Sequence, residues 1–176
     1  MYTIDSQGDK KMKTTPKIQT IEQIKNTTGR IYVRWSNSIT ADIKRGYSLR
    51  CGNQEEAGLS VVEIDPEWAD WRILRKVTEY QFTGASHCWL VTGDEVGRGG
   101  DDEPLLDNVQ LVGEIAQNLT NADWKTMQLK SYIAENKERL DGITDEIARR
   151  QTEEGIARYE KLLSDHLAGK QIEYIS

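Results

Sequence analysis

The stretch Arg30-Ile31-Tyr32-Val33-Arg34-Trp35-Ser36 is the part of the sequence that decides the fold class. Apolar residues occupy every second position, and the residues between them are mostly polar. One face would hold Ile31, Val33 and Trp35, and the other would hold Arg30, Tyr32, Arg34 and Ser36. A period of two is typical of a β-strand, because successive side chains point to opposite faces. We therefore expect a strand that is buried on one face only.

Three further stretches predict strands, and one motif before the first strand predicts a helix. The strand candidates are apolar or rich in β-branched residues, and they span residues 59–64, 87–92 and 108–115. The helix is indicated by Thr20 and Gln23, whose spacing is that of a capping box.

A longer helix is predicted to start at Asp65-Pro66-Glu67 and to continue to Tyr80. Aspartate is a good N-cap, and proline is tolerated at the first helical position because its missing N–H would have no partner there. Trp71, Leu74 and Val77 recur at helical spacing, so we expect this face to pack on the sheet.

From Asp123 onward, apolar residues recur at three- and four-residue steps, which predicts helices. Glycines at 142 and 155 indicate two or three helices or one interrupted helix. The predicted fold is α+β, with a small, mostly antiparallel sheet, one packed helix and a helical C-terminal arm. The expected divisions are a disordered tail (1–18), an α+β domain (19–122) and the arm (123–176).

Charge and composition restrict the possible partners and the location. The net charge is −6, and residues 65–107 are strongly acidic, so we expect no nucleic-acid partner, because such binding depends on Lys and Arg neutralising phosphates. No apolar run approaches membrane-spanning length, and no export signal is visible. We therefore expect a soluble cytoplasmic protein in which Cys51 and Cys88 are reduced structural thiols.

The segment 93–106, GDEVGRGGDDEPLL, is the first candidate site because it follows an apolar strand with glycines and many carboxylates. Its candidate ligand- or partner-binding residues are Asp94, Glu95, Arg98, Asp101, Asp102 and Glu103. We expect the carboxylates to hold Arg98, and the loop to bind a basic protein partner. No metal site is expected, because the spacing differs from known calcium loops and Arg98 would oppose a dication.

Three blocks of the chain are similar to those of a bacterial family known only as a domain of unknown function. The blocks are 32–36 (YVRWS), 58–61 (GLSV) and 95–106, where EVGRG and DEPLL flank Gly100-Asp101. The resemblance covers residues 20–122 and departs from the family at Gly100-Asp101. It implies a domain at these residues but no activity.

An enzymatic alternative rests on the order Arg34, Ser60 and then Glu95 or Glu103. This order is similar to that of ADP-ribosyltransferases, in which an arginine binds the NAD phosphates, a serine supports the nicotinamide pocket and a glutamate is catalytic. The resemblance implies a small NAD-dependent transferase or toxin. A guanidinium does bind a diphosphate well, and a carboxylate can stabilise a cationic centre.

Our primary hypothesis is a non-catalytic regulatory or interaction protein without a cofactor. It would use the acidic glycine-rich loop and the helical arm, the latter either for a protein partner or for self-association. The spatial arrangement of four residues separates this hypothesis from the enzymatic one. A shared cleft that contains Arg34, Ser60, Glu95 and Glu103 would favour an enzyme, and dispersal of these residues would argue against it.

Overall fold

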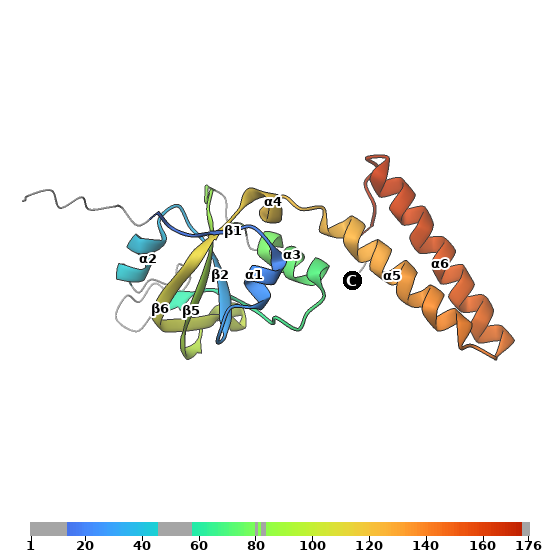
Figure 1. Cartoon of the computed structure of the whole chain (residues 1–176), viewed down its shortest axis with the longest axis horizontal. Helices are drawn as coiled ribbons and strands as arrows, with labels where there is room; N and C mark the ends of the chain where they lie inside the picture. Colours follow the sequence, from blue (N-terminus) through green and yellow to red (C-terminus); the bar gives the residue numbers. More distant parts are fainter. Residues whose placement is uncertain (1–13, 46–57, 80, 82–83, 174–176) are drawn as a thin grey trace, which may run out of the picture.

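The computed structural model describes residues 14–45, 58–79, 81 and 84–173 and confirms an α+β fold with C-terminal helices (Figure 1). The elements in chain order are β1 (Lys17–Ile18), α1 (Ile21–Lys25), β2 (Ile31–Trp35), α2 (Ile39–Arg45), β3 (Leu59–Ser60), β4 (Val62–Ile64), α3 (Asp70–Glu79), β5 (Cys88–Arg98), the 3-10 helix η1 (Gly100–Asp102), β6 (Pro104–Ile115), α4 (Gln117–Thr120), α5 (Trp124–Asp141) and α6 (Glu146–Leu167). Of the tail expected at residues 1–18, residues 1–13 lie outside the described residues, as do Cys51 and Tyr80, whereas Lys17–Ile18 form β1.

The strands form one curled sheet in the order β1-β6-β5-β2-β4, and β3 pairs with β6. All pairings are antiparallel except that of β1 with β6. The single strand expected at 59–64 is in fact two strands, because β4 pairs with β2 while β3 pairs with β6. This run therefore connects both ends of the β2-β5-β6 ladder, and the sheet closes on itself there.

The curl buries both faces of β2, so the prediction of a half-buried strand was wrong for its second face. Ile31, Val33 and Trp35 face α1, α3 and α4 in the larger core. Tyr32 faces the inside of the curl with Ile39 of α2, in a second core. The polar side chains on this inner face are thus also enclosed.

The β5–β6 hairpin is longer than the sequence predicted, and it includes most of the segment expected to be a loop. Pairing continues to Arg98↔Pro104, with irregularities at Thr92/Asp94 and Glu95/Gly97. Residues 94–98 therefore belong to β5, and only a short turn around η1 connects the strands. Sequence reasoning took the glycines as loop residues, but Gly97 pairs with Leu105 next to a β-bulge at Val96, and only Gly99 and Gly100 lie in the turn.

Helix α3 begins at Asp70 rather than at Pro66, because Asp65 caps a preceding turn instead of the helix. Its carboxylate accepts a hydrogen bond from Glu67 N at 2.9 Å, and its carbonyl accepts one from Trp68 N at 3.1 Å. The helix packs on the sheet through Ile73, Leu74 and Val77.

Trp71 does not belong to the sheet-facing side of α3, as had been expected. Its ring is half-buried and makes an edge contact with Tyr132 of α5, with 5.8 Å between the ring centroids. The Tyr132 ring in turn contacts the ring of Tyr159 in α6, with 5.4 Å between the ring centroids. A row of three aromatic rings thus connects the sheet domain with both helices of the arm.

The arm is a hairpin of α5 and α6 that extends away from the sheet on the side of α3 and α4 (Figure 1). Two long helices are present, and α6 continues through Gly155 without a break. Near the end of α6, His166 Nε2 lies 2.8 Å from Oδ1 of Asp123, the N-cap of α5. No helix in the described part of the chain has the length and apolarity needed to cross a bilayer.

Tyr32→Phe tests whether the Tyr32 hydroxyl has a hydrogen-bond partner inside the curl of the sheet. The Tyr32 hydroxyl is the described buried side-chain group that lacks a hydrogen-bond partner, and burial raises its pKa. Removing an unsatisfied hydroxyl should leave the free energy of unfolding unchanged or raise it by up to ~1 kcal/mol. Urea denaturation measures this change.

Tyr132→Phe is the matched control, because the Tyr132 hydroxyl accepts a hydrogen bond from Gln128 Nε2 at 3.2 Å. Its loss should lower the unfolding free energy by ~0.5–1.5 kcal/mol. A larger loss from Tyr32→Phe than from Tyr132→Phe would show that the Tyr32 hydroxyl is satisfied inside the curl.

Candidate functional site

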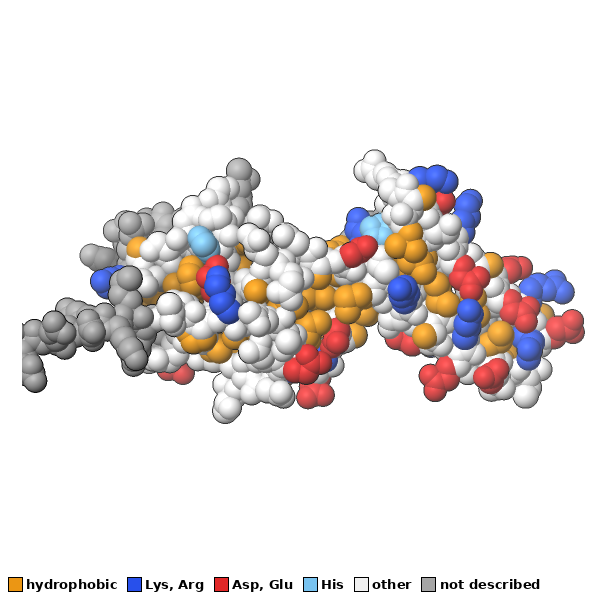
Figure 2. Space-filling model, turned by 45° about the horizontal axis from the view of Figure 1, so that its top comes forward, with side chains coloured by type: hydrophobic (Ala, Val, Ile, Leu, Met, Phe, Trp, Pro, Cys, Tyr) orange, Lys and Arg blue, Asp and Glu red, His pale blue; other side chains and the backbone are white. Residues whose placement is uncertain are grey.

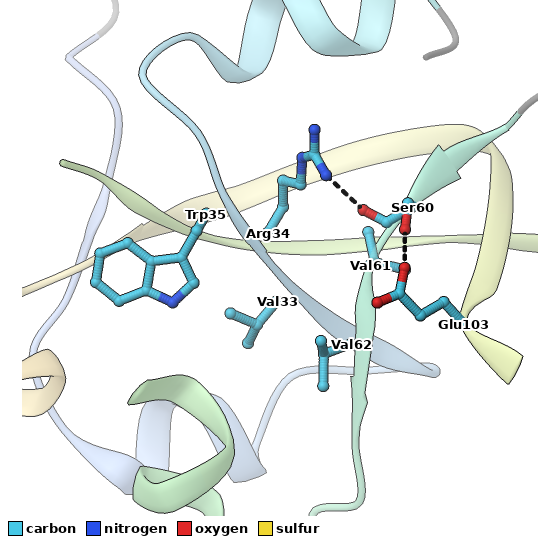
Figure 3. A pocket seen from close by; sticks show the side chains of 7 residues that line it. All are labelled: Val33, Arg34, Trp35, Ser60, Val61, Val62 and Glu103. Atoms are coloured by element: carbon cyan, nitrogen blue, oxygen red, sulfur yellow. Dashed lines mark hydrogen bonds between the residues drawn. The ribbon is translucent and has the colours of Figure 1, made fainter. Parts of the chain in front are cut away.

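Three of the residues singled out from the sequence meet at the seam where the sheet closes (Figure 3). Ser60 Oγ donates to Glu103 Oε2 at 2.6 Å, and Arg34 Nη1 donates to the Ser60 carbonyl at 3.1 Å. All three are buried, with exposed fractions of 3% for Arg34, 7% for Ser60 and 9% for Glu103. Of the two glutamates that the sequence left open, only Glu103 lies in this cluster.

The three members of the cluster come from three different segments of the chain. Arg34 points inward from β2, Ser60 lies opposite Leu105 in the β3–β6 pairing, and Glu103 directly precedes β6. Gly58 allows β3 to approach β6 this closely, because a Cβ atom at that position would lie 2.8 Å from the Leu106 carbonyl oxygen.

Asp42 is a fourth member, which sequence reasoning missed. Its carboxylate lies 3.3 Å from Arg34 Nε, and it projects from α2, which follows β2 directly. The only signal in the sequence was an acid one helical turn after the buried Ile39. A buried ion pair adds little net stability, but a buried charge without its partner is strongly unfavourable. The pair therefore fixes α2 to the inner face of the sheet.

The cavity at this cluster is too small for a nucleotide. Its volume is about 10 Å³, and it is lined by Val33, Arg34, Trp35, Ser60, Val61, Val62 and Glu103. This is space for no more than a water molecule. The described residues therefore do not fit NAD as they stand, and the Arg34 guanidinium is already bound to Asp42 and Ser60.

Glu103 also borders open space on its other side. An open hollow of about 170 Å³ lies there, and its charged lining residues include Lys76, Arg98 and Glu103. A ligand in this hollow would lie next to Glu103.

Glu95 and Arg98 belong to a separate network on the hairpin. Glu95 Oε2 lies 3.1 Å from Arg30 Nη2, and Glu95 Oε1 lies 2.9 Å from Arg98 Nε. Arg30 Nη2 also lies 2.8 Å from Glu63 Oε1. Arg98 Nη1 donates to the Asp102 carbonyl at 3.1 Å. Carboxylates from its own hairpin thus hold Arg98, as the sequence led us to expect.

The remaining acids of the hairpin complete the set of sequence candidates. Asp94 accepts a hydrogen bond from Asn108 Nδ2 at 2.9 Å, and the side chain of Asp101 lies outside the description. The structure therefore places Arg34, Ser60 and Glu103 together, and it places Asp94, Glu95, Arg98 and Asp102 on the hairpin beyond them.

Two other groups with shifted pKa values, Cys88 and Glu114, lie outside this cluster. Burial raises the pKa of the Cys88 thiol far above its usual range, so this cysteine stays protonated and unreactive. Burial opposes ionisation of Glu114, but hydrogen bonds from Lys17 and His87 outweigh it and lower the pKa of Glu114. Within the described ranges, no three His, Cys, Asp or Glu side chains gather as metal ligands.

Arg34→Leu should lower the free energy of unfolding by ~1–3 kcal/mol, because it leaves the partly buried Asp42, whose side chain is 14% exposed, without its partner. The double variant Arg34→Leu/Asp42→Leu should recover part of this loss, since both charges are then absent. Urea denaturation of the two variants gives the comparison.

Arg30→Leu is the control, since Arg30 lies near the same strand and pairs with Glu63, but its side chain is 55% exposed. Its loss should change the unfolding free energy by no more than ~1 kcal/mol. Equal losses from Arg30→Leu and Arg34→Leu would mean that Arg34 is solvated and does not stabilise the seam.

Comparisons with known proteins give a family but no activity. A family model described as a "Family of unknown function (DUF6098)" matches residues 8–138, which extends beyond residue 122 into α5. Searches of curated proteins and of solved structures found no match. Since the match covers well over half of the sequence, the chain belongs to the family of unknown function DUF6098.

Proposed function

We propose that this chain is a non-catalytic interaction protein that self-associates through its C-terminal hairpin, α5 and α6. The observation that carries the proposal is the incomplete burial of this hairpin. Two long helices pack on each other, yet only Gln128, Leu129 and Ile156 among their described residues are buried.

The hairpin leaves apolar surface exposed in a single copy. Ile147 and Leu167 are 70% and 64% exposed, and apolar side chains run along the arm between charged ones (Figure 2). Helix pairs of this kind are stabilised when a second pair covers the apolar side, as in four-helix bundles. Contact with another hairpin would remove this surface from water.

The charges of α5 favour a second copy in antiparallel orientation. Lys125 and Lys130 give its first half a net charge of +2, while Glu135, Glu138 and Asp141 outweigh Lys137 and Arg139 and give its second half a net charge of −1. A two-fold axis across α5 near residue 134 would place each basic first half next to the more acidic second half of the partner, with Lys130 opposite Glu138. Parallel packing would instead bring like charges together.

The acidic hairpin supports the proposal less than the arm does. Its residues Glu95 and Asp94 are already engaged within the chain, Glu95 by Arg30 and Arg98 and Asp94 by Asn108, so these two carboxylates are not poised for a basic partner. A row of aromatic rings instead connects the arm to the sheet domain, and it consists of Trp71, Tyr132 and Tyr159. This contact holds the α5–α6 hairpin so that it extends outward.

Sedimentation velocity over a range of protein concentrations tests self-association. The wild-type chain should form a dimer, and Ile147→Asp/Leu167→Asp should weaken it at least ~tenfold, because a charge would be buried at the interface. Val96→Asp is the matched control, since Val96 is 55% exposed on the β5–β6 hairpin and should have no effect.

Charge reversal tests the orientation. Lys130→Glu should weaken the dimer, and adding Glu138→Lys should restore it, since the two positions would face each other across the axis. A chain that stays monomeric at every concentration, or one that Val96→Asp disrupts equally, contradicts the proposal.

The convergence of Arg34, Ser60 and Glu103 favours a second candidate, an ADP-ribosyltransferase-like activity on NAD. Hydrogen bonds connect the three groups, and Glu103 borders the open hollow beside Lys76 and Arg98. Against it stands the small volume of the cavity at Arg34, so NAD would have to bind on the outer side of Glu103.

Release of nicotinamide from NAD by the purified chain tests this candidate. The activity should disappear in Glu103→Gln, which can keep the Ser60 hydrogen bond through its amide oxygen but lacks the carboxylate. Glu95→Gln, on the separate ion network, should retain it. No turnover by the wild-type chain together with no NAD binding in calorimetry removes the candidate.

A further inference from the structure

We propose that the outer side of α3 is a binding site for a small anion that carries a diphosphate group, with Arg72 and Arg75 as its principal ligands. This site is separate from the Arg34 cluster and from the outer surface of the arm.

The site is an open hollow of about 190 Å³ lined by Arg72, Arg75, Lys76 and Glu79. The three basic residues follow one another at steps of three and one along α3, so they share one side of the helix. Glu79 is the single acid in the hollow, and it lies 3.6 Å from Lys76. The four lining residues thus carry three positive charges and one negative charge, although the chain as a whole has a net charge of −6.

Two indole rings hold the arginines in place. The guanidinium carbon of Arg72 lies 4.3 Å from the ring centroid of Trp68, and that of Arg75 lies 5.4 Å from that of Trp124. Trp68 belongs to the turn before α3, whereas Trp124 begins α5. The hollow itself is lined by α3 residues alone, and the two rings from outside α3 contact its arginines.

Stacking on an aromatic ring orients a guanidinium and reduces the entropy that it loses when it binds an anion. The planar fork of N–H groups can then donate to two oxygens of one phosphate. Two such forks one helical turn apart fit two linked phosphate groups better than a single phosphate. The volume is that of a small anion, and the open side leaves room for the remainder of a larger molecule.

The hollow adjoins the one beside Glu103, because Lys76 lines both. A molecule bound through its diphosphate at Arg72 and Arg75 could therefore extend toward Glu103. The binding site itself does not depend on any activity of that glutamate.

Isothermal titration calorimetry of the full chain at low ionic strength tests the proposal, with inorganic pyrophosphate as the probe and orthophosphate and sulfate for comparison. Pyrophosphate should bind at least ~tenfold more tightly than sulfate. Arg72→Gln and Arg75→Gln should each weaken pyrophosphate binding about tenfold, and Arg75→Lys should weaken it too, because it keeps the charge but loses the fork.

Arg158→Gln is the matched control, since Arg158 also stacks on a ring, that of Tyr159 at 5.5 Å, but lies on the arm away from the hollow. Its affinity for pyrophosphate should be unchanged, and thermal melting should show that all variants are folded. Equal binding of sulfate and pyrophosphate, an equal loss in Arg158→Gln, or no binding of pyrophosphate would each overturn the proposal.

Discussion

The seam between β3 and β6 is the constraint on which the rest of the sheet depends. Among the described residues, Leu59↔Leu106 and Ser60↔Leu105 pair across it, with Val61 N donating to the Pro104 carbonyl at 3.4 Å. So short a ladder gains few backbone hydrogen bonds, and side chains supply the remaining connections. Ser60 connects the seam to Glu103, and Arg34 connects it to β2 and α2.

Closure of the seam explains why the inner face of β2 can be polar and yet buried. An open sheet would leave Arg34 and Ser36 in water, as their alternation with apolar residues suggested. Once the run 59–64 joins β2 to β6, the same side chains are enclosed and need partners inside the chain. Arg34 has two such partners, whereas the Tyr32 hydroxyl has none among the described residues.

Local signals in the sequence were sufficient for part of the fold. The alternation at 30–36 predicted β2, and the capping box at Thr20 and Gln23 is present with both of its hydrogen bonds. The start of α3 was misplaced because Asp65 can cap either a turn or a helix. In the structure Asp65 caps the turn that contains Glu67 and Trp68, and α3 begins after it.

Features that depend on pairing between distant strands could not be predicted in this way. The bulge at Glu95/Gly97 determines which side chains of the hairpin face Arg30, and so it separates Glu95 from Glu103. Asp42 was missed because a single acid on a short helix carries no motif. The sequence could therefore name Arg34, Ser60 and a choice of two glutamates, but not Asp42, nor which of the two glutamates lies in the cluster.

Hydrogen exchange at the Val61 amide tests most directly whether the seam is an integral part of the fold. If it is, this amide should exchange only through global unfolding, with the same free energy as the amides of the β2–β5 ladder, when NMR follows exchange over increasing denaturant. Exchange of the Val61 amide through a local opening of much lower free energy, with β2 and β5 still protected, would contradict this account.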